Sequence, residues 1–151
     1  MDFLQNGKTF RCNIIPDDTH GAPWENADCY GIVSDWEYRD KRPSERILCK
    51  DGVSTRFYDV AESIKKALRD GWGPARENMT KRQIAAHAVS ADFERLRAWC
   101  NGEWGYVYLE VFPLTEDGDE LRSKVQYIGG VESDDEDYIL ELAKELASEC
   151  K

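Results

Sequence analysis

Apolar and polar residues alternate along Lys8–Ile15, with Phe10, Cys12 and Ile14 on one side of the chain. A period of two is typical of a half-buried β-strand. Similar runs predict further strands at residues 32–39, 45–50, 55–58, 106–114 and 120–128. The last two runs flank Asp117-Gly118, a dipeptide that favours a tight hairpin turn.

Three helices are indicated by capping boxes, in which a short polar residue caps the first turn and an acid or amide three residues later caps it in return. The boxes are Asp59-Val60-Ala61-Glu62, Thr80-Lys81-Arg82-Gln83 and Ser133-Asp134-Asp135-Glu136. Apolar residues three and four apart follow each box, and they predict helices ending near Gly71, Asn101 and Glu149. The order of elements predicts one α+β domain over residues 1–151, with an antiparallel sheet and three helices packed mainly on one face.

Charge is distributed unevenly along the 151 residues. The chain has 30 acidic and 20 basic residues, a net charge of −10. Counted by thirds, the net charges are −2, +2 and −10. A net negative charge of this size disfavours adhesion to nucleic acid or to anionic membranes and favours a cationic partner. The chain also lacks an apolar run of about 20 residues and an apolar leader, so we expect a soluble, intracellular protein.

A carboxylate stripe lies opposite the apolar face of the last predicted helix. Its members are Asp134, Asp137, Glu141, Glu145 and Glu149. Like charges one turn apart destabilise a helix by a few tenths of a kcal/mol per pair, and their spacing of about 6 Å is of the same order as that of nucleic-acid phosphates. The stripe therefore predicts either a solvated face or a partner-binding surface that mimics nucleic acid, to which the acidic hairpin tip adds Asp117, Asp119 and Glu120.

Two tryptophans, Trp24 and Trp36, lie in a segment rich in turn-forming and acidic residues. Large aromatic side chains outside regular structure either fill a core or anchor a contact, so both tryptophans are candidates for partner binding. The same segment contains Asp17, Asp18, His20 and Glu25, which leaves an acid/base or metal cluster as a weaker alternative.

Other chemistry-bearing residues point to structural roles. The five cysteines are odd in number and include no C-x-x-C pair, so we expect reduced thiols and no metal. Asp92 lies on the apolar stripe of its helix, where it needs an arginine, a backbone amide or the indole N–H of Trp99 as a donor, the alternative being a catalytic acid. His87 falls on the polar side of that helix, which predicts a solvent-facing residue. No nucleotide-binding, hydrolase or metalloprotease motif is present, which favours a protein that is not an enzyme and uses no cofactor.

A resemblance is carried by Pro16-Asp17-Asp18, Gly21-Ala22-Pro23-Trp24-Glu25, Gly31-x-Val33-Ser34-x-Trp36, Asp70-Gly71-Trp72-Gly73 and the run from Asp92 to Asn101. On these residues the chain resembles a family of small bacteriophage and prophage proteins of unknown function. The resemblance implies a phage context and the cytoplasm of a bacterial host.

Together these features predict a phage-encoded acidic protein that binds and inhibits a host protein with a basic surface. The expected target is a nucleic-acid-handling or defence protein, with no direct binding of nucleic acid or membrane. Two alternatives remain open: a ligand-binding domain or enzyme that uses the Asp17–Trp36 segment, and a virion or assembly component.

Overall fold

The computed structural model describes all 151 residues, which divide into two compact units. Unit 1 comprises residues 1–20 and 104–151, and unit 2 comprises residues 21–103. The mixed α+β class and the antiparallel pairing are confirmed, but the strands form two sheets, of four and three strands, where the sequence predicted one. The prediction of a single domain over residues 1–151 stays a prediction.

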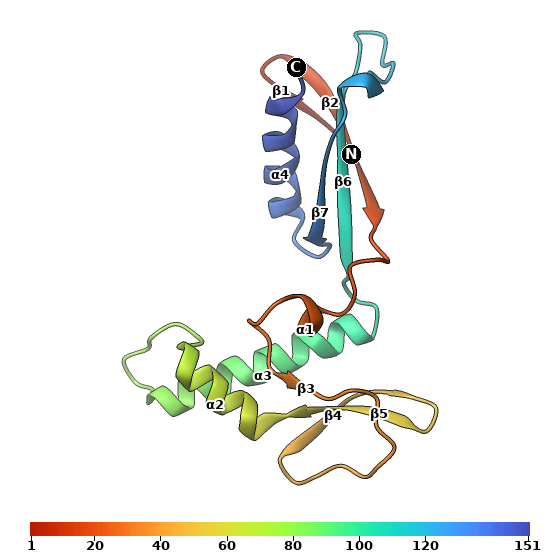
Figure 1. Ribbon diagram of the computed structural model, residues 1–151. Coiled ribbons are helices and arrows are strands. Elements are labelled where there is room, and N and C mark those ends of the chain that lie inside the picture. Colours follow the sequence, from red (N-terminus) through yellow and green to blue (C-terminus); the bar gives the residue numbers. More distant parts are fainter. The chain divides into compact units, whose positions relative to one another are not determined.

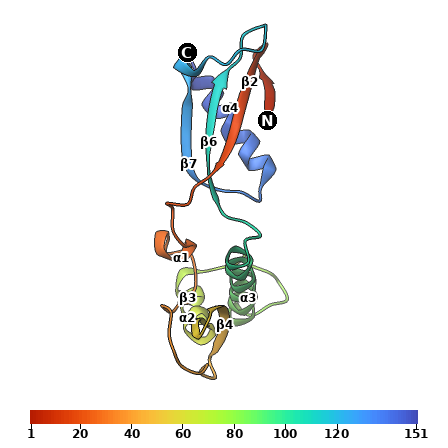
Figure 2. The same ribbon diagram turned by 90° about the vertical axis from the view of Figure 1, so that its right-hand side faces the viewer.

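Unit 1 is a four-stranded antiparallel sheet with one helix on it. The strands are β1 (Asp2–Gln5), β2 (Lys8–Pro16), β6 (Tyr106–Pro113) and β7 (Gln126–Glu132), in the order β1-β2-β6-β7. Helix α4 (Glu136–Glu149) covers one face of this sheet (Figures 1 and 2). Its residues Ile139, Ala143 and Leu146 form a buried cluster with Leu109 and Val111 of the central strand β6.

The connection between β6 and β7 differs in detail from the prediction. The Asp117-Gly118 turn is present, with Gly118 at φ 88°, a value that glycine adopts without strain. A short 3-10 helix, η1 (Arg122–Lys124), occupies part of the predicted strand 120–128, so β7 begins only at Gln126. It extends through Gly129 and Gly130, where the register against β6 shifts. Glycine weakens a strand pattern, which is why the predicted strand ended at residue 128, before these two glycines.

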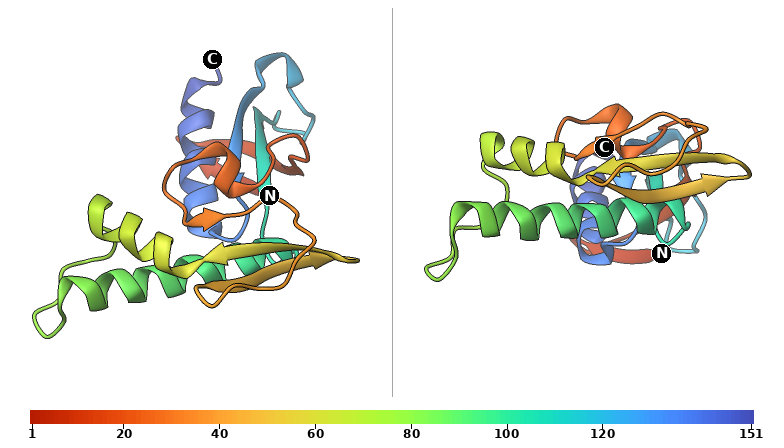
Figure 3. Two further views of the ribbon diagram at one scale, coloured as in Figure 1. Left: turned by 60° about the horizontal axis from the view of Figure 1, so that its bottom comes forward. Right: turned by 90° about the horizontal axis from the view of Figure 1, so that it is seen from below.

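Unit 2 packs two helices against a three-stranded antiparallel sheet. It contains the one-turn helix α1 (Pro23–Asn26), strands β3 (Ile32–Val33), β4 (Glu45–Asp51) and β5 (Ser54–Asp59), and helices α2 (Val60–Asp70) and α3 (Lys81–Cys100). The strand order is β3-β5-β4. Helix α3 runs along the β4–β5 hairpin (Figure 3), and Phe93 and Leu96 of α3 share a core with Leu48 and Tyr58 of the sheet.

The helix starts show how local the capping signals are. The Asp59 side chain accepts a hydrogen bond from the Glu62 N–H, and Thr80 and Gln83 cap each other reciprocally, as predicted. The third box fails, because Asp135 and not Ser133 caps α4 by accepting from the Tyr138 N–H. Asp134 therefore precedes the helix. No helix of the structure has both the length and the apolar character that a membrane crossing needs.

Unit 2 is an insertion between two neighbouring strands of unit 1. Strands β2 and β6 are paired as far as Pro16 and Val107, and the Asp17 N–H donates to the Tyr106 carbonyl at 2.9 Å. The chain thus leaves the sheet at β2, builds the whole of unit 2, and returns beside the point of departure.

Candidate functional site

The two units differ completely in charge. Unit 1 holds 16 of the 30 acidic residues and 6 of the 20 basic residues, a balance of −10. Unit 2 holds 14 of each and is neutral. All of the net charge of the chain therefore belongs to one unit, which is a sharper division than the count by thirds.

Helix α4 carries the largest set of carboxylates in unit 1. Asp137, Glu141, Glu145 and Glu149 are all exposed, and none of them forms an ion pair. Lys144 is the single basic residue of the helix. Four members of the predicted stripe thus lie on the solvent side of α4, while the fifth, Asp134, lies in the turn before it.

Three carboxylates on or beside the sheet of unit 1 are paired with arginines of the same unit. Arg11 contacts Asp2 at 2.9 Å and Glu120 at 3.0 Å, and Arg122 contacts Glu120 at 2.8 Å and Glu110 at 2.6 Å. Hydrogen bonds from Arg122 and then Arg11 lower the pKa of Glu120. Of the three predicted hairpin-tip residues, Glu120 is therefore already paired, whereas Asp117 and Asp119 are exposed and form no ion pair.

Trp24 and Trp36 belong to unit 2, so the ten predicted contact residues do not share one unit. The guanidinium of Arg56 lies 5.1 Å from the ring centroid of Trp24 and 4.9 Å from that of Trp36. Trp24 also contacts Trp99 edge-on, with centroids 5.4 Å apart. Trp24 thus packs against the body of unit 2, while Trp36 is 43% exposed.

Asp92 is a structural acceptor. Its Oδ2 accepts from the Tyr58 hydroxyl at 2.7 Å and from the Gly31 N–H at 2.9 Å, which confirms the predicted bond to a backbone amide. Burial raises the pKa of Asp92, although the bonds from Tyr58 and Gly31 and the charge of Lys66 act in the opposite direction. Tyr58 and Gly31 could not be identified as partners from the sequence, because they are 34 and 61 residues away.

The other candidate groups form local contacts. Asp17 accepts from the N–H and the hydroxyl of Thr19, and Glu25 accepts from the Ala22 N–H. His87 is exposed. No group of three His, Cys, Asp or Glu side chains is placed to hold a metal ion.

All five cysteines are free thiols. Cys29 is exposed and Cys12 is fully buried, where burial raises its pKa. Burial and then a hydrogen bond with Cys49 raise the pKa of Cys100 to about 12. A thiol held protonated in this way is a poor nucleophile, so burial argues against a nucleophilic role for Cys12 and Cys100.

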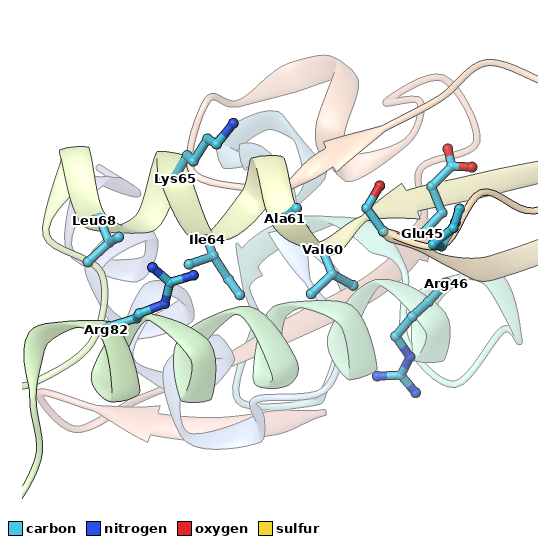
Figure 4. Close-up of a pocket in the computed structure, with 10 residues that line it drawn as sticks. Glu45, Arg46, Val60, Ala61, Ile64, Lys65, Leu68 and Arg82 are labelled. Atoms are coloured by element: carbon cyan, nitrogen blue, oxygen red, sulfur yellow. The ribbon is translucent and has the colours of Figure 1, made fainter.

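A cavity of about 430 Å³ that the sequence did not indicate lies in unit 2, between α2, the start of α3 and the start of β4 (Figure 4). Apolar side chains of α2 and three basic residues line it. The apolar residues spaced along α2 did not indicate a cavity, because the same spacing is expected of residues that pack in the core.

No family model matches this chain, and no curated protein or solved structure matches it either. A function for the protein therefore rests on its own charges, contacts and cavities.

Proposed function

We propose that unit 1 binds a basic surface of a partner protein through the solvent side of α4. The observation that carries the proposal is the contrast between two groups of carboxylates in the same unit. Asp2, Glu110 and Glu120 are paired with Arg11 or Arg122, whereas the α4 carboxylates have no cationic partner. Unpaired carboxylates attract a cationic surface and speed its association.

In its finer form, the proposal is that the partner is a nucleic-acid-handling or defence protein of a bacterial host, inhibited because α4 occupies its nucleic-acid site. Two features support this form. Glu141, Glu145 and Glu149 recur once per turn on a rigid helix, at a spacing of the order of phosphate separations. The resemblance to phage proteins adds a setting in which a small protein gains by occupying a host protein.

The test is a charge reversal of three exposed helix positions, Glu141→Lys, Glu145→Lys and Glu149→Lys. We expect capture of partners from a bacterial lysate to fall at least about tenfold, because attraction becomes repulsion. The helix should persist, since lysine is a good helix former and a basic residue at position 149 suits the C-terminal end of the helix dipole. Pull-down with quantitative mass spectrometry at low and high salt measures capture, and circular dichroism checks the fold.

The matched control makes the same change in unit 2, at the exposed and unpaired residues Asp51, Glu77 and Glu103. Both triple variants change the net charge from −10 to −4. Capture should survive in the control. Equal losses in the two variants would mean that only net charge matters, and unchanged capture by the α4 variant would remove the proposal.

Nucleic-acid mimicry makes a further demand on the captured protein. Duplex DNA and the wild-type protein should compete for it, and the α4 variant should lose the competition. If the captured protein binds DNA and the wild-type protein at the same time, mimicry is excluded, and only the coarser proposal of a partner with a basic surface remains.

A further inference from the structure

The cavity of unit 2 combines an apolar strip with basic side chains. Val60, Ile64 and Leu68 line it from three successive turns of α2. At 1.5 Å per residue the strip is about 12 Å long. Leu68 lies beside this cavity and is 42% exposed, so part of the apolar strip is accessible to a ligand.

Most charged groups around the cavity are already engaged. Lys65 pairs with Glu62 at 2.9 Å, and Arg46 contacts Glu94 at 3.7 Å while its guanidinium lies over the Phe93 ring. The one carboxylate in the lining, Glu45, accepts two hydrogen bonds from Arg39, at 2.7 and 2.8 Å. The lining therefore offers little negative charge to a ligand.

Arg82 is the exception. It is exposed and forms no ion pair or side-chain hydrogen bond. Figure 4 shows its side chain extending from α3 toward Ile64 and Leu68, while Lys65 points away from them. An unpaired guanidinium thus lies at one end of an apolar strip.

The first turn of α3 reinforces this positive charge. It contains no acidic residue, whereas α1, α2 and α4 each have one or more, and it carries Lys81 and Arg82. Two cations near the positive end of a helix dipole are unfavourable in the free protein. A bound anion would relieve that arrangement.

We propose that this cavity binds a small amphipathic anion, a linear aliphatic carboxylate of about eight to ten carbons. The alkyl chain lies along Val60, Ile64 and Leu68, and the carboxylate meets the Arg82 guanidinium, which can donate two parallel hydrogen bonds to it. The volume of about 430 Å³ lies within the range of small-molecule pockets. Every residue of this site belongs to unit 2, so the proposal does not depend on the acidic face of α4.

The experiment titrates the full-length, ¹⁵N-labelled protein with octanoate below its micelle concentration. We expect saturable amide shifts centred on Val60, Ile64, Leu68 and Arg82. 1-Octanol, which has the same chain and no charge, should bind about tenfold more weakly, because it loses the charge-assisted hydrogen bonds. Octylamine should produce no saturable shifts there.

Two variants of the same turn separate the site from general electrostatics. Arg82→Glu should weaken octanoate binding at least about tenfold. Lys81→Glu changes the charge equally at a residue outside the lining and should weaken binding only about threefold, because it removes long-range attraction but no hydrogen bond to the carboxylate. Neither variant should melt at a lower temperature, since an acid suits the first turn of a helix. Absence of saturable shifts, equal affinity for octanoate and octanol, or equal losses in the two variants would overturn the proposal.

Discussion

At the scale of single residues, one buried network holds the segment before β3 in place. Gly31 donates its N–H to Asp92, which also accepts from the Tyr58 hydroxyl, and Ile32 donates to the buried Ser63 hydroxyl at 2.9 Å. A Cβ on Gly31 would overlap the Tyr58 hydroxyl. Glycine is therefore needed at position 31 because a side chain would clash with Tyr58. Its backbone conformation does not require glycine, since its φ lies outside the left-handed region.

Gly31→Ala should lower the free energy of unfolding by about 2–4 kcal/mol, because the Tyr58 ring has to move and leaves buried polar groups without partners. Urea denaturation measures the change. Gly105→Ala is the control: a Cβ there meets nothing within 4 Å, so its cost should stay below about 1 kcal/mol. A Gly31 variant as stable as the control would show that this network does not hold the segment.

At the scale of elements, the approach to β4 depends on one carboxylate. Glu45 begins the strand, accepts a forked pair of hydrogen bonds from Arg39 and accepts another from the Arg42 N–H. The bonds from Arg39 are the largest of the effects that lower the pKa of Glu45 to about 2. These contacts fold the connection from β3 back onto the sheet.

Because the pKa of Glu45 is lower in the folded protein than in the unfolded chain, its contribution to stability is complete above about pH 4.5 and is lost as the pH falls toward 2. Glu45→Gln should therefore destabilise the protein at neutral pH and make its stability less dependent on pH between 4.5 and 2. Thermal melts of both proteins across this range test the expectation. Parallel curves would assign the acid sensitivity to other groups.

At the scale of the whole molecule, two units with different charge and separate cores share one chain. Strands β2 and β6 are adjacent where unit 2 begins and ends, so unit 1 is continuous without it. The two proposed binding sites therefore lie in different parts of the chain: the acidic face of α4 belongs to unit 1, which carries the −10 charge, and the cavity belongs to unit 2, which is neutral.

Replacing residues 21–103 by a flexible linker of a few Gly and Ser residues should leave unit 1 folded, because the Asp17 to Tyr106 hydrogen bond already brings its two chain segments together. We expect a cooperative thermal transition, the β-sheet signature in circular dichroism, and retention of the partner captured by α4. Loss of the cooperative transition would favour the single domain that the sequence predicted.

Features that depend on neighbours along the chain could be predicted from the sequence. The starts of α2 and α3, the Asp117-Gly118 turn, the α+β class and the excess of acids in the last third follow from short motifs and periodicity. The start of α4 was wrong by two residues because three adjacent polar residues compete for its cap.

Contacts between residues far apart in the chain could not be predicted from the sequence and emerged with the three-dimensional fold. In the fold the strands belong to two sheets, unit 2 lies between β2 and β6 in the chain, and Glu120 pairs with Arg11, which is 109 residues away. Arg82 of α3 also lies beside the apolar strip of α2, and together they line the cavity. These arrangements arise from burial and pairing between segments far apart, which leave no periodic mark on the chain.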